Sequence, residues 1–134
     1  MCSSLFRGTA NEARFVEEWI QRIRSSNDPG LKSVGILVRP HPARIDEWRG
    51  SEISAFRDVA MWGSHPVDRV GKDDYFDSLY HCAAVVGLNS SALLEAAVVG
   101  RPVHTVILPE ISRANQEGTI HFHYLLNVNG GLYF

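Results

Sequence analysis

The feature that most constrains the fold is a strand–helix–strand pattern in the second half of the chain. Residues 83–88 form a continuous apolar run, which predicts a strand buried on both faces of a sheet. The polar residues 89–91, the apolar stretch 92–99 and the Gly-Arg-Pro sequence at 100–102 are typical of a helix with its cap and stop. The apolar run 103–108 predicts the next strand. This order indicates βα units around a parallel sheet.

The same alternation is present toward the amino terminus. Apolar residues at helical spacing predict a helix over residues 10–24, and the run 34–39 predicts another strand apolar on both faces. Weaker patterns indicate the end of a strand at 2–6, a turn at 25–30, a strand at 57–62, a loop at 63–72 and a helix from Asp73 or Asp74 to about residue 82. We therefore expect an α/β fold: a Rossmann-like open parallel sheet of about four to five strands with helices on both faces.

Size and charge favour a single folded domain. A chain of 134 residues favours one domain over two, and 45% hydrophobic residues are enough to bury a core. Thirteen Lys and Arg residues against fifteen Asp and Glu residues give a net charge of −2. This balance argues against the basic face of a protein that coats nucleic acid. We expect one Rossmann-like domain, residues 1–134, with no nucleic-acid partner.

The sequence has no membrane or secretion signal. No apolar run reaches the length that spans a bilayer, and the amino-terminal residues lack the hydrophobic region of a signal peptide. Cys2 and Cys82 are too few for a disulfide framework, which favours a cytoplasmic protein. The strand-like segment 2–6 and the apolar last residues, 130–134, indicate cuts through a larger protein, and a complete small domain with frayed ends is the alternative. We expect a domain fragment whose exposed apolar face would allow it to self-associate.

The sharpest candidate binding site is the junction between the strand at 83–88 and the helix that follows it. Asn89, Ser90 and Ser91 stand where free backbone amides and the positive end of the helix dipole attract anions. Ligands of open α/β sheets bind at this carboxyl end of the strands. These residue types are also the preferred caps of any helix, so anion binding and simple capping both fit the pattern.

Glu95 is the candidate acid beside this junction. It follows Ser91 by four residues on the same helical face, where its carboxylate would accept hydrogen bonds from ribose hydroxyls. Its neighbours in the helix are apolar, so we expect it to face a cleft or a buried partner rather than open solvent.

A second candidate site follows the strand at 34–39. Pro40 and Pro42 fix the backbone around His41, and a rigidly held imidazole near a phosphate would donate a hydrogen bond or act as a general acid. Arg39 would pair with the same anion or form a salt bridge. A loop histidine without a function is the alternative for His41.

The sequence gives no metal site and no cofactor motif. His121 and His123 have the spacing of a metal pair, but a third ligand is not apparent nearby. The sequence also contains no Walker A loop, dinucleotide-binding glycine fingerprint, nucleophile elbow or zinc-protease helix. We therefore expect neither a metal nor a bound cofactor.

The order of these parts resembles the carboxyl-terminal, donor-binding half of a GT-B glycosyltransferase. Three segments carry the resemblance: VGILVRPHP at 34–42, DYFDSLYHCAAVVGLNSSALLE at 74–95 and AAVVGRPVHTV at 96–106. They are similar to the Arg-x-His-Pro element and the Ser-Ser-x-x-x-Glu helix start of capsule polysaccharide transferases, polysialyltransferases and CDP-glycerol glycerophosphotransferases. The likeness covers most of residues 10–108.

This resemblance implies a function and a partner. His41, Ser90 and Ser91 would contact the diphosphate of a nucleotide-sugar donor, with His41 catalytic, and Glu95 would lie near the ribose. The acceptor site and the general base would belong to a missing amino-terminal domain, so the isolated chain should be inactive. The implied role is in polysaccharide or cell-surface glycan biosynthesis in bacteria. Two alternatives remain: a nucleotide-sugar 2-epimerase-like domain, and a non-catalytic flavodoxin-like binding module.

Overall fold

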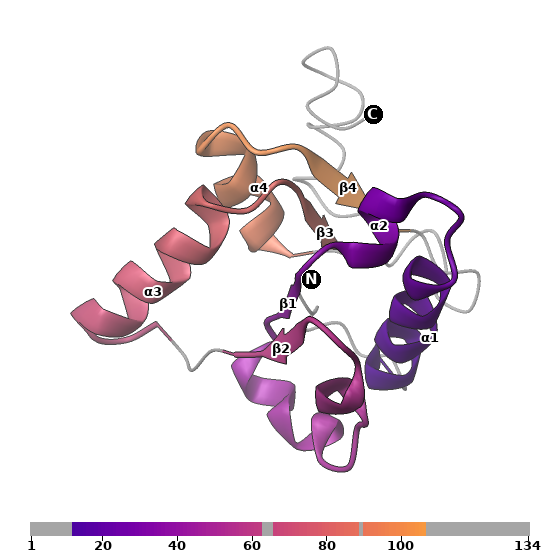
Figure 1. Ribbon diagram of the computed structural model, residues 1–134. Coiled ribbons are helices and arrows are strands. Elements are labelled where there is room, and N and C mark those ends of the chain that lie inside the picture. Colours follow the sequence, from indigo (N-terminus) through magenta and orange to yellow (C-terminus); the bar gives the residue numbers. More distant parts are fainter. Residues whose placement is uncertain (1–11, 63–65, 89, 107–134) are drawn as a thin grey trace.

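The computed structural model describes residues 12–62, 66–88 and 90–106 (Figure 1). Helices and short strands alternate along this part of the chain, which is the α/β class expected from the sequence. In chain order the elements are α1 (Glu12–Arg24), α2 (Pro29–Ser33), β1 (Ile36–Val38), the 3-10 helices η1 (Pro42–Trp48) and η2 (Ile53–Ala55), β2 (Val59–Met61), α3 (Arg69–Tyr80), β3 (Val85–Gly87), α4 (Ser91–Val98) and β4 (Val103–Thr105).

The strands form two parallel pairs rather than one sheet. β1 pairs with β2, with Leu37 opposite Ala60, and β3 pairs with β4, with Val86 opposite His104. The expected sheet of four to five strands is therefore wrong for the residues that the structure describes. The reason is local: β1 hydrogen-bonds β2, β3 hydrogen-bonds β4, and no strand in the described ranges joins the two pairs.

The first pair has its own hydrophobic core, built around α1. The apolar stripe of this helix buries Val16 and Ile20 completely against β1, as the helical spacing in the sequence predicts. Ile36 and Val38 face this core from β1, whereas Leu37 between them is partly exposed. The prediction of a strand buried on both faces therefore holds for one face of β1 in the described structure.

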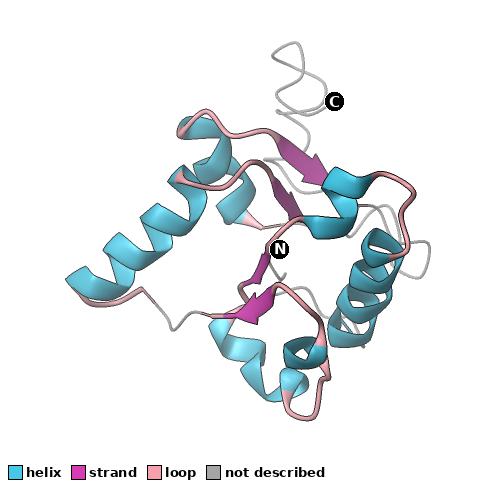
Figure 2. Ribbon diagram, viewed as in Figure 1, coloured by secondary structure: helices cyan, strands magenta, loops and turns pink. Residues whose placement is uncertain are grey.

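The second pair has a separate core around α4. Leu93 and Ala96 are fully buried on this helix and pack with Leu79, Val85 and Val103. In Figure 2, α3 lies on one side of the strands and α1 on the other, so helices flank both sides of the strand region. None of the helices in the described ranges has the length and apolar character needed to cross a membrane.

Two helix starts differ from the sequence-based expectation. The segment expected to be a turn at 25–30 contains the first residues of α2, because Asp28 accepts hydrogen bonds from the amides of Gly30 and Leu31 at 2.7 and 3.1 Å. α3 begins at Arg69, inside the segment expected to be a loop, because Asp68 accepts from the Gly71 amide at 2.7 Å. The carboxylate of Asp68 therefore caps α3 in place of the expected Asp73 or Asp74.

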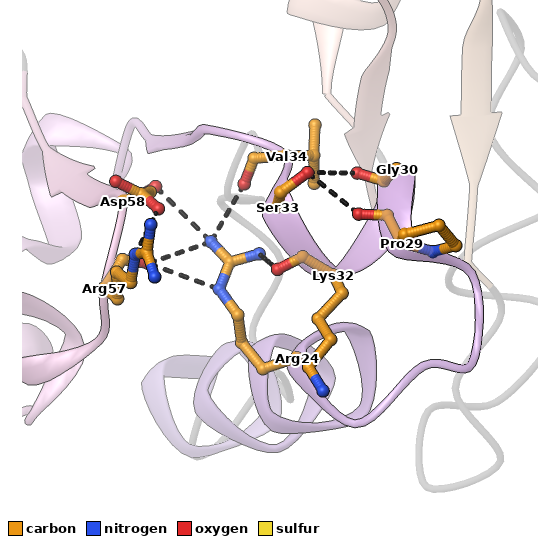
Figure 3. A network of polar contacts seen from close by, with 8 residues as sticks. All are labelled: Arg24, Pro29, Gly30, Lys32, Ser33, Val34, Arg57 and Asp58. Atoms are coloured by element: carbon orange, nitrogen blue, oxygen red, sulfur yellow. Dashed lines mark hydrogen bonds and ion pairs between the residues drawn. The ribbon is translucent and has the colours of Figure 1, made fainter.

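Arg24 ties the end of α1 to the start of the β1–β2 pair (Figure 3). Its guanidinium donates hydrogen bonds to the carbonyl oxygens of Val34 at 2.9 Å, Arg57 at 3.0 and 3.2 Å, Lys32 at 3.3 Å and Asp58 at 3.4 Å. These carbonyls belong to the chain segments that enter β1 and β2. Arg24, which the helical pattern places on the water-facing side, therefore holds both strand entries.

Candidate functional site

The polar junction after β3 is a capped helix start. Ser90 has extended backbone angles, its Oγ accepts a hydrogen bond from the Ala92 amide at 3.3 Å, and its carbonyl accepts from the Leu93 amide at 3.1 Å. Burial of Ala92 and Leu93 fixes the axis of α4 against the second core. The capping role that the sequence left open is thus present, and Asn89 lies outside the described residues.

Ser91 and Glu95 form the exposed side of the same helix start. Ser91 is the first residue of α4 and both side chains are solvent-exposed, four residues apart on one helical face. The Glu95 carboxylate faces solvent rather than the buried partner expected from its apolar neighbours. A ligand that approaches α4 from its amino-terminal end can therefore reach the Ser91 hydroxyl, the positive end of the helix dipole and the Glu95 carboxylate.

Arg39 is held inside a contact group rather than left free at the strand end. Its Nη1 lies 3.4 Å from the Asp74 Oδ2, and its guanidinium lies over the Tyr75 ring at 5.3 Å from the ring centre. Asp74 also accepts a hydrogen bond from the Trp62 Nε1 at 2.7 Å. The Arg39 side chain is only 10% exposed and pairs with Asp74. Of the two alternatives that the sequence left open, Arg39 therefore forms the salt bridge.

His41 begins the turn that leads into η1. It is partly buried between the buried Pro40 and the partly buried Pro42, and its carbonyl accepts a hydrogen bond from the Arg44 amide at 2.9 Å. Arg44 forms a two-bond ion pair with Glu47, at 2.7 and 2.6 Å. The hydrogen bonds that the Arg44 guanidinium donates to the Glu47 carboxylate raise the pKa of Arg44 above its usual value, and burial opposes this effect. The turn after His41 is therefore fixed by both backbone and side-chain bonds.

The structure brings some of the predicted residues together and leaves others on separate elements. Arg39 and His41 follow β1, whereas Ser90, Ser91 and Glu95 follow β3 in the other strand pair. The convergence of the imidazole and the two hydroxyls on a common pocket stays a prediction. The contacts of Arg39 with Asp74 and Tyr75, and of Trp62 with Asp74, were missed by sequence reasoning, because spacing along the chain does not reveal contacts between distant elements.

A large cavity lies between the two strand pairs, away from the predicted anion site. It has a volume of about 970 Å³. Its mostly apolar lining comes from α1, α2, the four strands and the end of α3, and it includes the polar residues Asp77, His81 and His104. Of the predicted site residues that the structure describes, only Arg39 lines it. The cavity is therefore a different feature from the helix start at Ser90.

The described residues contain no group of three or more His, Cys, Asp or Glu side chains that could hold a metal ion. His121 and His123 lie outside the described residues. Comparison of the chain with protein-family models, curated proteins and solved structures gave no match. The described structure therefore defines an α/β protein with two short parallel strand pairs and a polar helix start after β3.

Proposed function

We propose that this chain is the donor-binding half of a glycosyltransferase-like protein that uses a nucleotide-sugar in bacterial polysaccharide or cell-surface glycan synthesis. The carrying observation is the start of α4, where an extended Ser90 caps the helix and the Ser91 hydroxyl is exposed at the carboxyl end of β3. An anion bound there would gain hydrogen bonds and the positive end of the helix dipole.

The proposed chemistry is electrostatic stabilisation of the departing nucleoside diphosphate. The Ser91 hydroxyl and the first-turn amides of α4 would bind phosphate oxygens, and His41 would donate a proton or a hydrogen bond to the leaving phosphate. Glu95, one helical turn beyond Ser91, would accept hydrogen bonds from the ribose. The acceptor and its general base would come from a second domain of a cytoplasmic protein, so this chain by itself would bind donor weakly without turnover.

Arg39 has a positioning role in this proposal. The Arg39 guanidinium already pairs with the Asp74 carboxylate and lies over the Tyr75 ring. It would therefore orient the turn at Pro40 and His41 rather than bind phosphate itself. Of the two alternatives that the sequence left open for Arg39, this proposal therefore uses the salt bridge rather than the direct contact with the anion.

The test is a titration of the chain with CDP and UDP, followed by amide NMR shifts. We expect the amides of Ser91 and Ala92 to shift at millimolar nucleotide, and Ser91→Ala to weaken this binding by about threefold to tenfold, since one hydrogen bond to a charged group is lost. Ser54→Ala, which removes an exposed hydroxyl from η2, is the matched control and should leave the titration unchanged.

Two outcomes would remove the proposal. An absence of shifts at Ser91 and Ala92 with both nucleotides would exclude a donor site at this helix start. Equal shifts with inorganic phosphate at the same concentration would reduce the site to a general anion site. A shift at His41 in the same titration would support the convergence of the two strand ends.

A further inference from the structure

The exposed face of α3 carries two stacked aromatic side chains. Phe76 and Tyr80 are four residues apart, which places them on the same side of the helix. Their ring centres are 5.4 Å apart with the planes within 17° of parallel, and the two residues are 48% and 45% exposed. Figure 1 shows α3 at one side of the molecule, next to α4. This face of α3 therefore presents an aromatic pair to solvent.

Arg101 lies beside this pair with its charge unpaired. Its guanidinium lies 5.4 Å from the centre of the Tyr80 ring, and the residue is partly buried. The Arg101 Nε is enclosed without a hydrogen-bond partner, and in the part of the chain that the structure describes no carboxylate pairs with this guanidinium. The other partly buried arginines there, Arg24, Arg39 and Arg44, each have an ion pair or hydrogen bonds. A partly desolvated cation is unfavourable without a counter-charge, so Arg101 would gain from an external carboxylate.

The charges on the two flanks of the aromatic pair are opposite. At about 100° of turn per residue, Leu79 lies about 60° to one side of Phe76, and Asp77 lies about 100° to the other. Leu79 packs into the core around α4, and α4 leads to Arg101, so Arg101 and the exposed Lys72 form a basic flank on this side. Asp77 forms the acidic flank: it is exposed, and its carboxylate has no ion pair among the described residues.

These flanks make the face complementary to itself. When two copies meet with their α3 helices running in the same general direction, a two-fold axis brings the basic flank of each copy opposite the acidic flank of the other. Arg101 would then face the partner's Asp77, and the aromatic pairs of both copies would meet between them. Arg69 and Asp73, also on α3, pair with each other at 3.7 Å and leave this balance unchanged.

We propose that this face of α3, together with Arg101, binds a second copy of the chain in a two-fold symmetric dimer. A second copy fits better than an unrelated acidic partner, because the face carries an unpaired carboxylate as well as an unpaired guanidinium and the symmetric contact satisfies both. The contact has the kinds of side chain that dominate interfaces, namely aromatic rings and arginine. A helix of 12 residues is only about 18 Å long, so we expect a weak dimer that forms at about 0.1–1 mM protein.

Sedimentation of the 134-residue chain between about 10 μM and about 1 mM tests this proposal. We expect the average mass to rise from that of the monomer toward that of the dimer. Arg101→Glu and Asp77→Lys should each raise the dissociation constant about tenfold or more, because each reversal opposes like charges and occurs twice in a two-fold dimer. Arg22→Glu, at an exposed position of α1, is the matched control and should leave the constant unchanged.

A mixture of the two variants tests the pairing itself. The Asp77 carboxylate of the Arg101→Glu chain would face the Arg101 guanidinium of the Asp77→Lys chain, and the introduced glutamate and lysine would form the second pair. The equimolar mixture should therefore dimerise about as well as the parent chain, although each variant alone does not.

Three results would count against the proposal. A parent chain that stays monomeric at about 1 mM would exclude the dimer and leave this face to a different partner. A dimer that survives both reversals would place the contact on another surface. Loss of the dimer in both variants without recovery in the mixture would reject the pairing of Arg101 with Asp77.

A measurement on the parent chain decides the case if a reversal does not fold. Dilution from about 1 mM to about 50 μM should move the amide NMR signals of Phe76, Asp77 and Tyr80 and leave that of Ile20 in α1 unchanged. Constant α3 signals over this range would overturn the proposal. Because these assays use no nucleotide, their failure is distinct from a failure of the donor-site proposal.

Discussion

At the scale of single residues, Arg24 shows how one side chain can fix several backbone segments. Its guanidinium reaches the carbonyls of four residues in the segments that enter β1 and β2. The planar fork of an arginine serves several acceptors at once, which a lysine ammonium on a flexible stem does not reproduce. Arg22, two residues earlier on the same helix, is exposed. The two residues therefore form a matched pair for mutation.

We predict that Arg24→Ala lowers the free energy of unfolding by about 2 kcal/mol, because charge-assisted bonds to partly exposed carbonyls are lost. Arg24→Lys should recover about half of this loss. Arg22→Ala should stay within about 0.5 kcal/mol of the parent chain. Urea unfolding followed by circular dichroism measures all three, and equal effects of Arg22→Ala and Arg24→Ala would contradict the assigned role.

Asp74 is the second residue with a defined role, since its carboxylate accepts from Trp62 and pairs with Arg39. We predict that Asp74→Ala destabilises the chain by about 1 kcal/mol, a value kept low because the carboxylate is 44% exposed. The fluorescence of the chain should also change, because the Trp62 indole loses its acceptor. Asp73→Ala, which removes an exposed ion pair with Arg69, is the control. An unchanged emission spectrum for Asp74→Ala would argue against this contact.

At the scale of elements, the caps decide where the helices begin. Asp28, Asp68 and Ser90 each accept first-turn amide bonds, and each stands directly before its helix. Sequence reasoning placed the cap of α4 among residues 89–91, because a strand ended just before them, and the structure assigns it to Ser90. The other two were missed because several Asp and Ser residues stand close together in those segments, and local sequence did not select one of them.

For α4 we predict that Ser90→Ala costs about 1 kcal/mol of stability through the loss of the cap. Ser91→Ala should change stability by less than about 0.5 kcal/mol, because this residue lies inside the first turn and alanine favours the helix. Thermal or urea unfolding separates the two variants. Equal losses would show that the Ser91 hydroxyl also supports the fold, and its use as a binding-site variant would then need reinterpretation.

At the scale of the whole molecule, the two hydrophobic cores are distinct clusters on two strand pairs. Leu93 is fully buried in one and Ile20 in the other. The two clusters share no member, and the cavity lies between the strand pairs that carry them. Packing losses in one core should therefore leave the side-chain contacts of the other intact.

We predict that Leu93→Ala costs about 2–5 kcal/mol and Ile20→Val about 0.5–1.5 kcal/mol of unfolding free energy. The double variant should lose the sum of the two within about 0.5 kcal/mol, because the sites share no packing partner. Denaturant unfolding of the four chains completes this cycle. A coupling energy well above that limit would show that the two cores pack as one.

The sequence by itself determined the α/β class, the positions of β1, β3 and β4, the stripe of α1 and the capped start of α4. These features depend on periodicity, apolar runs and capping residues, which act over a few neighbouring residues.

Only the tertiary structure decided how the strands pair, which carbonyls Arg24 holds and that Arg39 is committed to Asp74 and Tyr75. It also revealed the cavity between Leu37 and Val86. These features join residues that are distant in the chain, and their energies depend on packing and on backbone edges that no local pattern encodes.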